Sequence, residues 1–470
     1  MGQTQASGFP TSNPREIRPN LRPRPVPYQY SPVPNAAMAP GMEEGASPFQ
    51  SLACYAAFCM IVVRCGVLPE ISVNLLHVNT YLLYIVGPPA ILGCLLTGGL
   101  GRAFRSSPVR LFLGFFLCML MATPGSSWPG ASASKDLDYL RADLICMFVV
   151  AGLIVTWKQV LGAMKAMALS GFIILMVARV FAKPDDNGRL YLDLGFDGVI
   201  SNSNDLAAHV ILLLPYILFS ALKPRRNNLL RVLVLGCVCY GCWVILGTSS
   251  RGTMLGLVAI SLFLFFRASG TQRIAVMVLV PVLALGLVAV LPKSNLARLS
   301  TVFGGRVEQT GDDEASESMD SRQYLVMQSI KLTFQHPIFG IGPSQFANVE
   351  GKQAKARGEN GNWHETHNTY TQVSSECGIP ALLLFLAAFA SVFSKVNQTY
   401  KSARNAGNNE VAQVCLWYLA SVIGYMVSIM FLACAYRFTL PLLIGLGVAI
   451  NFGARRQLAT LSLQPGVPAR

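Results

Sequence analysis

Long apolar runs recur along almost the whole chain, and they constrain its fold more than any other feature. Each has about 17 to 25 residues and few charges, the length that a helix needs to cross the hydrocarbon core of a bilayer. Hydrophobic residues make up 53% of the sequence and charged residues only 13%, which places the chain outside the ordinary soluble class. We therefore predict an all-α polytopic membrane protein with about twelve transmembrane helices, at residues 51–68, 79–98, 108–123, 141–157, 160–181, 204–222, 230–247, 252–267, 273–291, 378–394, 413–431 and 434–453.

The distribution of basic residues predicts how these helices are oriented. In a soluble protein the net charge of +14 would suggest a nucleic-acid partner. Here Lys and Arg gather instead in alternate connections, for example at 102–110, 223–231 and 395–404. Because strongly basic connections stay in the cytoplasm, we place these segments and both termini there. The other connections then face outward, into the periplasm if the membrane is a bacterial inner membrane, and no nucleic-acid partner is expected.

One long polar segment interrupts the apolar pattern and divides the chain. Residues 292–378 form a large periplasmic loop after the ninth predicted span. Residues 51–291 carry the first nine spans, and residues 379–453 carry the last three. The two ends, 1–50 and 454–470, are predicted to be cytoplasmic tails, and the Pro-rich first tail is too polar to fold and should be disordered.

The polar loop has an internal order of its own. Its first part, 295–320, is acidic and poor in hydrophobic residues, so we expect it to be mobile. Arg322 then opens an amphipathic pattern that predicts a helix lying along the membrane interface. This helix should stop before Pro337, and the sequence of Gly340–Pro343 predicts a tight turn after it.

Two arginines and one histidine are the strongest candidates for a reactive centre. Arg251 lies in a short turn of Gly, Thr and Ser residues, Arg322 opens the loop helix, and His367 lies near the end of the loop. Two guanidinium groups can hold a diphosphate through forked hydrogen bonds and stabilise it as a leaving group. An imidazole can accept the proton of an attacking hydroxyl. For Arg251 taken alone, snorkelling to lipid phosphates is the alternative.

Five further residues are secondary candidates for substrate binding. Asp205 and His209 share a helix face at the start of the sixth span, where an interhelical hydrogen bond is the simpler interpretation. Asn368 lies in the loop, Glu376 lies just before the tenth span, and Arg437 lies in the turn between the last two spans. Lipid anchoring explains Arg437 about as well as substrate binding does.

No metal and no cofactor are expected. The sequence His364-Glu365-Thr366-His367 is one residue short of the zincin spacing, and no third ligand is evident. The loop has neither a Walker sequence nor a complete dinucleotide fingerprint. The twelve cysteines lie mostly inside apolar runs, so we interpret them as core or lipid-facing residues rather than as disulfides or zinc ligands.

Several short motifs, in order along roughly residues 50–453, resemble the O-antigen ligase and polymerase superfamily of bacterial envelope glycosyltransferases. They are Ser203–Ala207, Thr248–Gly252, Ser321-Arg322, His336–Phe346, His367–Tyr370 and Glu376–Gly378. The resemblance implies a metal-independent, inverting transfer of a glycan from undecaprenyl diphosphate to an acceptor hydroxyl at the outer face of the inner membrane. It also implies that Arg251, Arg322 and His367 are the essential residues.

The resemblance leaves the acceptor open. A ligase of lipopolysaccharide biosynthesis would use a lipid A core sugar, a polysaccharide polymerase would use the growing glycan, and a protein-glycosylating relative would use Ser or Thr. The rival from another class is a transporter or flippase of lipid-linked glycans. Such a protein should show internal repeats and ionisable residues near the middle of the membrane, whereas the candidate residues here cluster toward one face.

Overall fold

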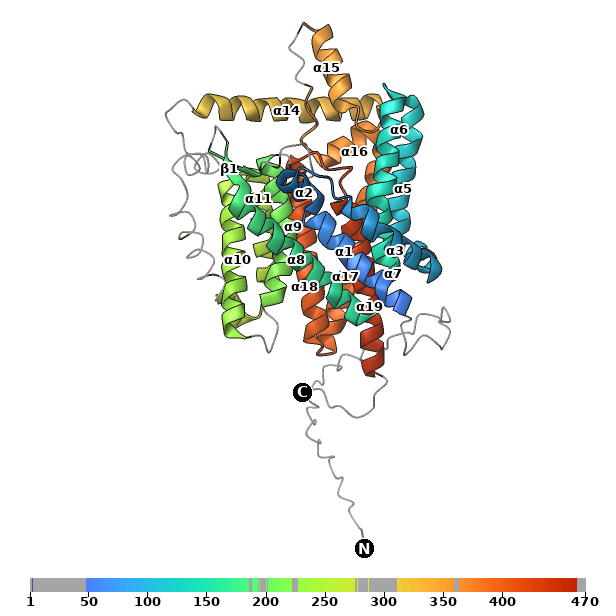
Figure 1. Cartoon of the computed structure of the whole chain (residues 1–470), viewed down its shortest axis with the longest axis vertical. Coiled ribbons are helices and arrows are strands. Elements are labelled where there is room, and N and C mark those ends of the chain that lie inside the picture. The colour runs from blue at the N-terminus through green and yellow to red at the C-terminus, as the bar shows by residue number, and fades with distance from the viewer. Residues whose placement is uncertain are drawn as a thin grey trace. The chain divides into compact units, whose positions relative to one another are not determined.

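The described part of the chain is almost entirely helical, as the sequence predicts (Figure 1). The structure is a computed structural model that describes residues 48–185, 188–192, 202–221, 227–274, 311–358 and 363–462, with the single positions 2, 194, 200, 277 and 286. Nearly all of the predicted N-terminal tail, and residues 295–310 of the acidic segment, lie outside the described residues. The predicted C-terminal tail is helical as far as Ser462.

The helices fall into two groups, separated by the start of the long polar segment. Those before it are α1 (Pro48–Cys65), α2 (Leu68–Leu76), α3 (Leu82–Leu96), α4 (Gly99–Phe104), α5 (Ser107–Ala122), η1 (Thr123–Gly125), α6 (Pro129–Asp138), η2 (Tyr139–Leu144), α7 (Ile145–Leu153), α8 (Trp157–Phe181), α9 (Ser203–Ala221), α10 (Asn228–Gly247) and α11 (Arg251–Arg267). Those after it are α14 (Gly311–Gln335), α15 (Phe346–Ala356), α16 (Thr369–Cys377), α17 (Ile379–Asn405), α18 (Asn409–Ser428), η3 (Ile429–Phe431) and α19 (Thr439–Ser462). Two short strands, β1 (Ala182–Pro184) and β2 (Leu190–Leu192), pair antiparallel with Ala182 opposite Leu192.

The structure supports several membrane spans, but fewer than the sequence predicts. Helices occupy all the predicted ranges except 273–291, which lies mostly outside the described residues. Among the described residues, six helices are long and apolar enough to cross a membrane, or seven if α1 and α2 form one span bent by 62°. The difference has a physical cause, because hydropathy measures apolar content and does not detect where a helix ends. Thus α3 has only 15 residues, and the chain breaks after α1 at Val67, whose φ is 47°.

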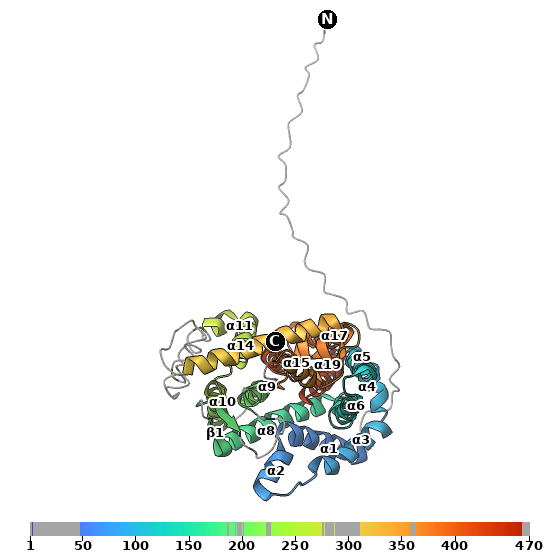
Figure 2. The same ribbon diagram turned by 90° about the horizontal axis from the view of Figure 1, so that it is seen from above.

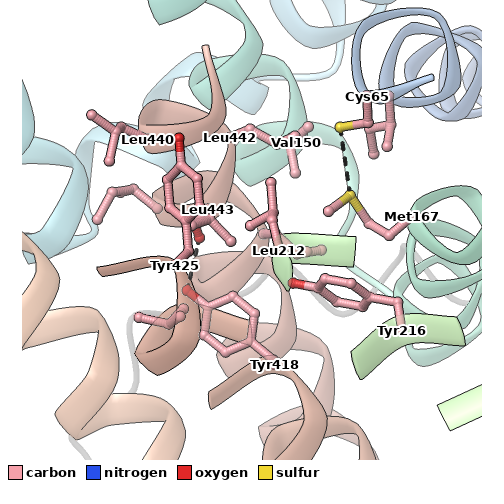
Figure 3. Close-up of a cluster of buried hydrophobic side chains, with 14 of the residues drawn as sticks. Cys65, Val150, Met167, Leu212, Tyr216, Tyr418, Tyr425, Leu440, Leu442 and Leu443 are labelled. Carbon is pink, nitrogen blue, oxygen red and sulfur yellow. Dashed lines mark hydrogen bonds between the residues drawn. The ribbon is translucent and has the colours of Figure 1, made fainter. Parts of the chain in front are cut away.

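Several polar side chains inside the helix bundle form hydrogen bonds between helices, as expected where water is absent. The Tyr418 hydroxyl of α18 donates to the Leu443 carbonyl of α19 at 2.8 Å, and the Ser421 hydroxyl of α18 donates to the Leu212 carbonyl of α9 at 2.6 Å. Figure 3 shows the buried cluster around Tyr418. These contacts hold α9, α18 and α19 together.

The helix α14 lies across the ends of the long helices rather than beside them (Figures 1 and 2). Its crosswise placement fits the predicted helix along a membrane surface, but its predicted start is wrong. The helix begins at Gly311, so Arg322 lies inside it rather than opening it. The acidic composition that suggested a mobile segment also suits the first turns of a helix, where the macrodipole favours negative charge.

The predicted turn after α14 is confirmed, and it ties the polar segment to α16. Gly340 and Gly342 have φ of +68° and +102°, values that favour glycine. A Cβ on Gly340 would lie 2.3 Å from the carbonyl carbon of Glu376. The amides of Ile341 and Gly342 donate to the carbonyls of Ser375 and Glu376 at 2.9 and 3.0 Å. The turn therefore rests directly on the backbone of α16.

Candidate active site

A pocket of about 370 Å³ opens beside α14, where segments far apart in the sequence meet. Its walls come from the β-hairpin, the start of α9, the turn between α10 and α11, α14, the segment before α16, and η3. The lining residues are Arg189, Asn204, Ser249, Ser250, Arg251, Gly252, Arg322, Gln323, Val326, His367, Asn368, Met430 and Phe431. The structure thus brings together the three residues predicted as a reactive centre, and Asn368 with them.

The charge of this lining favours an anionic ligand. Three arginines, Arg189, Arg251 and Arg322, line the pocket, and among the described residues no Asp or Glu lines it. Arg251 is also the first residue of the helix α11, so the positive end of that helix dipole lies at the same place. Backbone amides and guanidinium groups that converge at a helix N-terminus suit a phosphate group.

Small residues form the turn that carries Arg251. Ser249 has a φ of 50°, in the left-handed region, which lets the chain reverse between α10 and α11. A Cβ on Gly252 would lie 2.5 Å from the ring of Phe431, so a larger residue does not fit without a shift. The turn is therefore packed against η3, and this contact fixes where α11 and its first side chain begin.

Arg189 is a pocket residue that the sequence prediction did not single out. Its Nε donates to the Thr248 carbonyl at 2.9 Å, and an Nη donates to Oδ1 of Asn204 at 2.7 Å. Its own amide donates to Oδ1 of Asp185 at 2.7 Å, a contact that shapes the hairpin turn. Arg189 therefore joins the hairpin to α9 and to the turn before α11. The sequence offered only a charge in an outward-facing connection, a signal that several residues share.

The backbone around His367 is fixed from both sides. His367 has a φ of 50°, a left-handed conformation that is uncommon outside glycine. The next residue, Asn368, caps α16, and its Oδ1 accepts the amides of Tyr370 and Thr371 at 2.9 and 3.1 Å. Thr369 donates its hydroxyl to the Leu432 carbonyl at 2.7 Å. Asn368 therefore positions His367 through the helix cap, in addition to lining the pocket.

The imidazole of His367 is held in its neutral form. Burial, together with the positive charges of Arg322 and His364, lowers the pKa of His367 from 6.5 to about 4. The rings of His364 and His367 lie 6.3 Å apart, centroid to centroid. A neutral imidazole near neutral pH has a lone pair that can accept a proton. Within the described residues, no three His, Cys, Asp or Glu side chains are grouped to hold a metal ion.

Asp205, His209 and Arg437 lie outside the lining of this pocket. Asp205 of α9 is buried, and its Oδ2 lies 3.0 Å from a guanidinium nitrogen of Arg437. One ring nitrogen of His209 lies 2.7 Å from the Cys65 carbonyl of α1. The interhelical hydrogen bond predicted for His209 is therefore confirmed.

Glu376 also lies outside the pocket lining, beneath the turn that follows α14. Its carboxylate accepts the amides of Ser344 and Phe346 at 3.0 and 2.9 Å, and the Tyr436 hydroxyl at 2.7 Å. Phe346 is the first residue of α15, so the carboxylate lies at the positive end of that helix. The contacts of Glu376 hold the turn and α15 in place.

A second pocket, also of about 370 Å³, contains Arg437. It is strongly polar, and its walls come from α1, α6, η2, the turn before α15, the segment before α16, and the segment between η3 and α19. The lining residues are Arg64, Lys135, Asp138, Ala142, Asp143, Ser344, Glu365, Gln372, Ala433, Tyr436, Arg437 and Phe438. Its described lining residues, unlike those of the first pocket, include as many acidic as basic side chains.

Comparison with known proteins finds a family that one segment of the chain resembles. Residues 232–386 match the family model described as O-antigen ligase. None of the curated proteins matches the chain. The matched segment contains Arg251, Arg322, His367 and Asn368, whereas Arg189, Asp205 and Arg437 lie outside it. This chain is thus similar to the O-antigen ligase family over residues 232–386.

Proposed function

We propose that this protein transfers a glycan from undecaprenyl diphosphate to an acceptor hydroxyl, in the pocket that Arg251, Arg322 and His367 share. Enzymes of the O-antigen ligase family are ligase and polymerase glycosyltransferases that use lipid-linked glycans. The observation that carries the proposal is the meeting of three arginines and one neutral histidine in one pocket. A transporter needs a site for the diphosphate, but it has no use for a base beside it.

The chemistry follows from the placement of these groups. Arg251 and Arg322 hold the diphosphate and stabilise the negative charge that grows on it as the glycosidic bond breaks. The acceptor oxygen attacks the anomeric carbon from the opposite side, so the configuration there inverts. The bonding electron pair leaves with the diphosphate, and the proton of the acceptor hydroxyl passes to the His367 imidazole. Arg189 adds a third positive charge to the same wall.

The orientation of the chain is part of the proposal. Arg251 opens α11 at the pocket, so Arg267 at the other end of α11 lies on the far side of the bundle. There its guanidinium donates to Asn397 of α17 at 2.7 Å, within the basic segment 395–404. Basic residues favour the cytoplasmic side. We therefore place the pocket on the periplasmic side of a bacterial inner membrane, both termini in the cytoplasm, and about twelve spans in between.

The test uses the purified full chain in detergent with an undecaprenyl-diphosphate oligosaccharide as donor. Release of undecaprenyl diphosphate and glycosylation of the acceptor are measured for the wild type and for Arg251→Ala, Arg322→Ala and His367→Ala. The matched control is Arg105→Ala, because Arg105 is exposed and lines neither pocket. We expect transfer by the wild type and by the control, and its loss in the three pocket variants. No transfer by the wild type, or full activity in all three variants, would contradict the proposal.

The acceptor is the remaining choice within the proposal. Lipid A core and the donor glycan itself are supplied in parallel reactions. Transfer to lipid A core identifies a ligase of lipopolysaccharide biosynthesis, which we favour. A ladder of donor-derived glycan lengths identifies a polysaccharide polymerase instead.

A further inference from the structure

The two pockets lie side by side, because two separate segments of the chain line both of them at positions two residues apart, and an ion pair links them at a third place. Glu365 lines the second pocket and His367 the first. Phe431 lines the first pocket and Ala433 the second. Two residues of extended chain span at most about 7 Å, so the walls that separate the pockets are thin along both segments.

The third connection runs through an ion pair. Asn204 lines the first pocket, and the next residue, Asp205, pairs at 3.0 Å with Arg437 of the second pocket. A molecule in the second pocket therefore lies within reach of His367. This proximity is what a base needs if it is to take a proton from a second substrate.

The charges of the second pocket favour a neutral ligand. Its three basic residues, Arg64, Lys135 and Arg437, are balanced by Asp138, Asp143 and Glu365. Arg64 pairs with Asp143, and Asp138 pairs with Arg141 at 2.6 Å. In the first pocket the described lining residues include three arginines and no carboxylate. The two neighbouring sites therefore differ in the kind of ligand they suit, an anion in one and a neutral polar molecule in the other.

Two charged side chains of the second pocket are not engaged in ion pairs. Among the described residues, neither Lys135 nor Glu365 has an oppositely charged partner within 4.0 Å. Lys135 instead lies over the ring of Tyr436, with its Nζ 5.7 Å from the centroid. An ammonium donor and a carboxylate acceptor that line the same pocket suit the hydroxyl groups of a sugar, each of which can both donate and accept.

We propose that the second pocket binds a neutral sugar unit of the acceptor and holds its hydroxyl toward His367. This inference rests on the proposed function, since it assigns the acceptor site of that same reaction. The acceptor hydroxyl gives its proton to His367 as its oxygen bonds to the anomeric carbon, and the diphosphate leaves in the first pocket with the electron pair. The diphosphate and the acceptor hydroxyl thus lie in two neighbouring pockets, on opposite sides of the transferred sugar.

Chemical footprinting of Lys135 tests the proposal without requiring any transfer. The full chain in detergent is acetylated with an N-hydroxysuccinimide ester, and the rate at Lys135 is compared by mass spectrometry with that at Lys352, an exposed lysine of α15. The probes are methyl glucoside and methyl galactoside as neutral sugars, with glucuronate and inorganic diphosphate as anions. We expect the neutral sugars to slow acetylation of Lys135 at least about threefold and to leave Lys352 unchanged. Glucuronate and diphosphate should protect Lys135 less.

A variant and a donor control make the outcome decisive. Glu365→Gln removes a charged acceptor, so the sugar concentration for half-protection should rise about tenfold. Glu410→Gln, in the first turn of α18 and in the lining of neither pocket, is the control and should leave that concentration unchanged. The undecaprenyl-diphosphate oligosaccharide alone should leave Lys135 reactive. The proposal is overturned if no neutral sugar protects Lys135, if diphosphate protects it better, if Glu365→Gln has no effect, or if the donor alone protects it. Failure of transfer in the activity assay leaves this readout intact, so the two proposals fail separately.

Discussion

The guanidinium of Arg437 lies 3.0 Å from the carboxylate of Asp205, and this pair joins α9 to the segment between η3 and α19. Each partner is next to a pocket. Asn204, beside Asp205, lines the first pocket, and Arg437 itself lines the second. This ion pair therefore links the two pockets, and both of its residues lie outside the segment matched by the family model.

Removing Arg437 should destabilise the protein because it takes away the guanidinium that is paired with a buried carboxylate. Asp205 is only 4% exposed, and its Oδ2 also accepts a hydrogen bond from the side-chain amide of Asn202 at 2.9 Å. We expect Arg437→Met to lower the free energy of unfolding by about 3 kcal/mol. The double variant Asp205→Asn with Arg437→Met should recover much of that loss. Thermal unfolding in detergent measures both, and an unchanged midpoint in the single variant would contradict the assignment.

Lysine substitutions should separate the charge of the two arginines from their geometry. A lysine keeps the positive charge but loses the forked pair of donors. We expect Arg251→Lys and Arg322→Lys to reduce kcat about 10- to 100-fold, and the alanine variants to reduce it about 1000-fold. The rate of undecaprenyl diphosphate release at saturating donor measures this. If the lysine and alanine variants lose kcat equally, then the positive charge without the forked donors does not contribute to the rate.

The protonation of His367 should respond to Arg322. In the ligand-free protein the pKa of His367 is lowered to about 4 by burial and by the neighbouring cations. Replacing Arg322 with methionine removes one of these charges, so the pKa should rise toward 6.5, its ordinary value. Titration of carbon-13-labelled histidine by NMR follows this directly, with His367→Gln to assign the signal. If the titration midpoint of His367 stays in place or falls in Arg322→Met, then Arg322 does not lower the pKa of His367.

The same shift sets a dependence of stability on pH. The folded protein resists protonation of His367, whereas the unfolded chain takes up the proton near pH 6.5. Between about pH 6.5 and 4 the unfolded state binds more protons, so stability should fall as the pH is lowered through that window. His367→Gln should reduce this loss. If the wild type and His367→Gln lose stability in parallel, the neutral imidazole is not the cause.

The sequence predicts residues whose roles depend on chemical type better than residues whose roles depend on long-range contacts. Arg251, Arg322 and His367 are recognisable because their groups suit a diphosphate and a hydroxyl, and the structure brings them into one pocket. Glu376 was predicted to bind substrate, yet its partners are the amides of Ser344 and Phe346, supplied by a turn that no local pattern connects with α16. The fold class followed from hydropathy, whereas helix ends and breaks depend on packing that hydropathy does not record.

Gly252 offers a test of how closely the position of Arg251 is controlled. A Cβ at this glycine would lie 2.5 Å from the ring of Phe431, which also lines the pocket, so Gly252→Ala must displace either η3 or the start of α11. A displacement of about 1 Å at a catalytic group can cost about 100-fold in rate, so the variant should lose activity even though it remains folded. Gly236→Ala is the matched control, because a Cβ at Gly236 of α10 meets nothing within 4 Å. Transfer rate and melting temperature are measured for both variants. If Gly252→Ala is as active as Gly236→Ala, then the turn tolerates the added methyl group and the contact with η3 does not position Arg251.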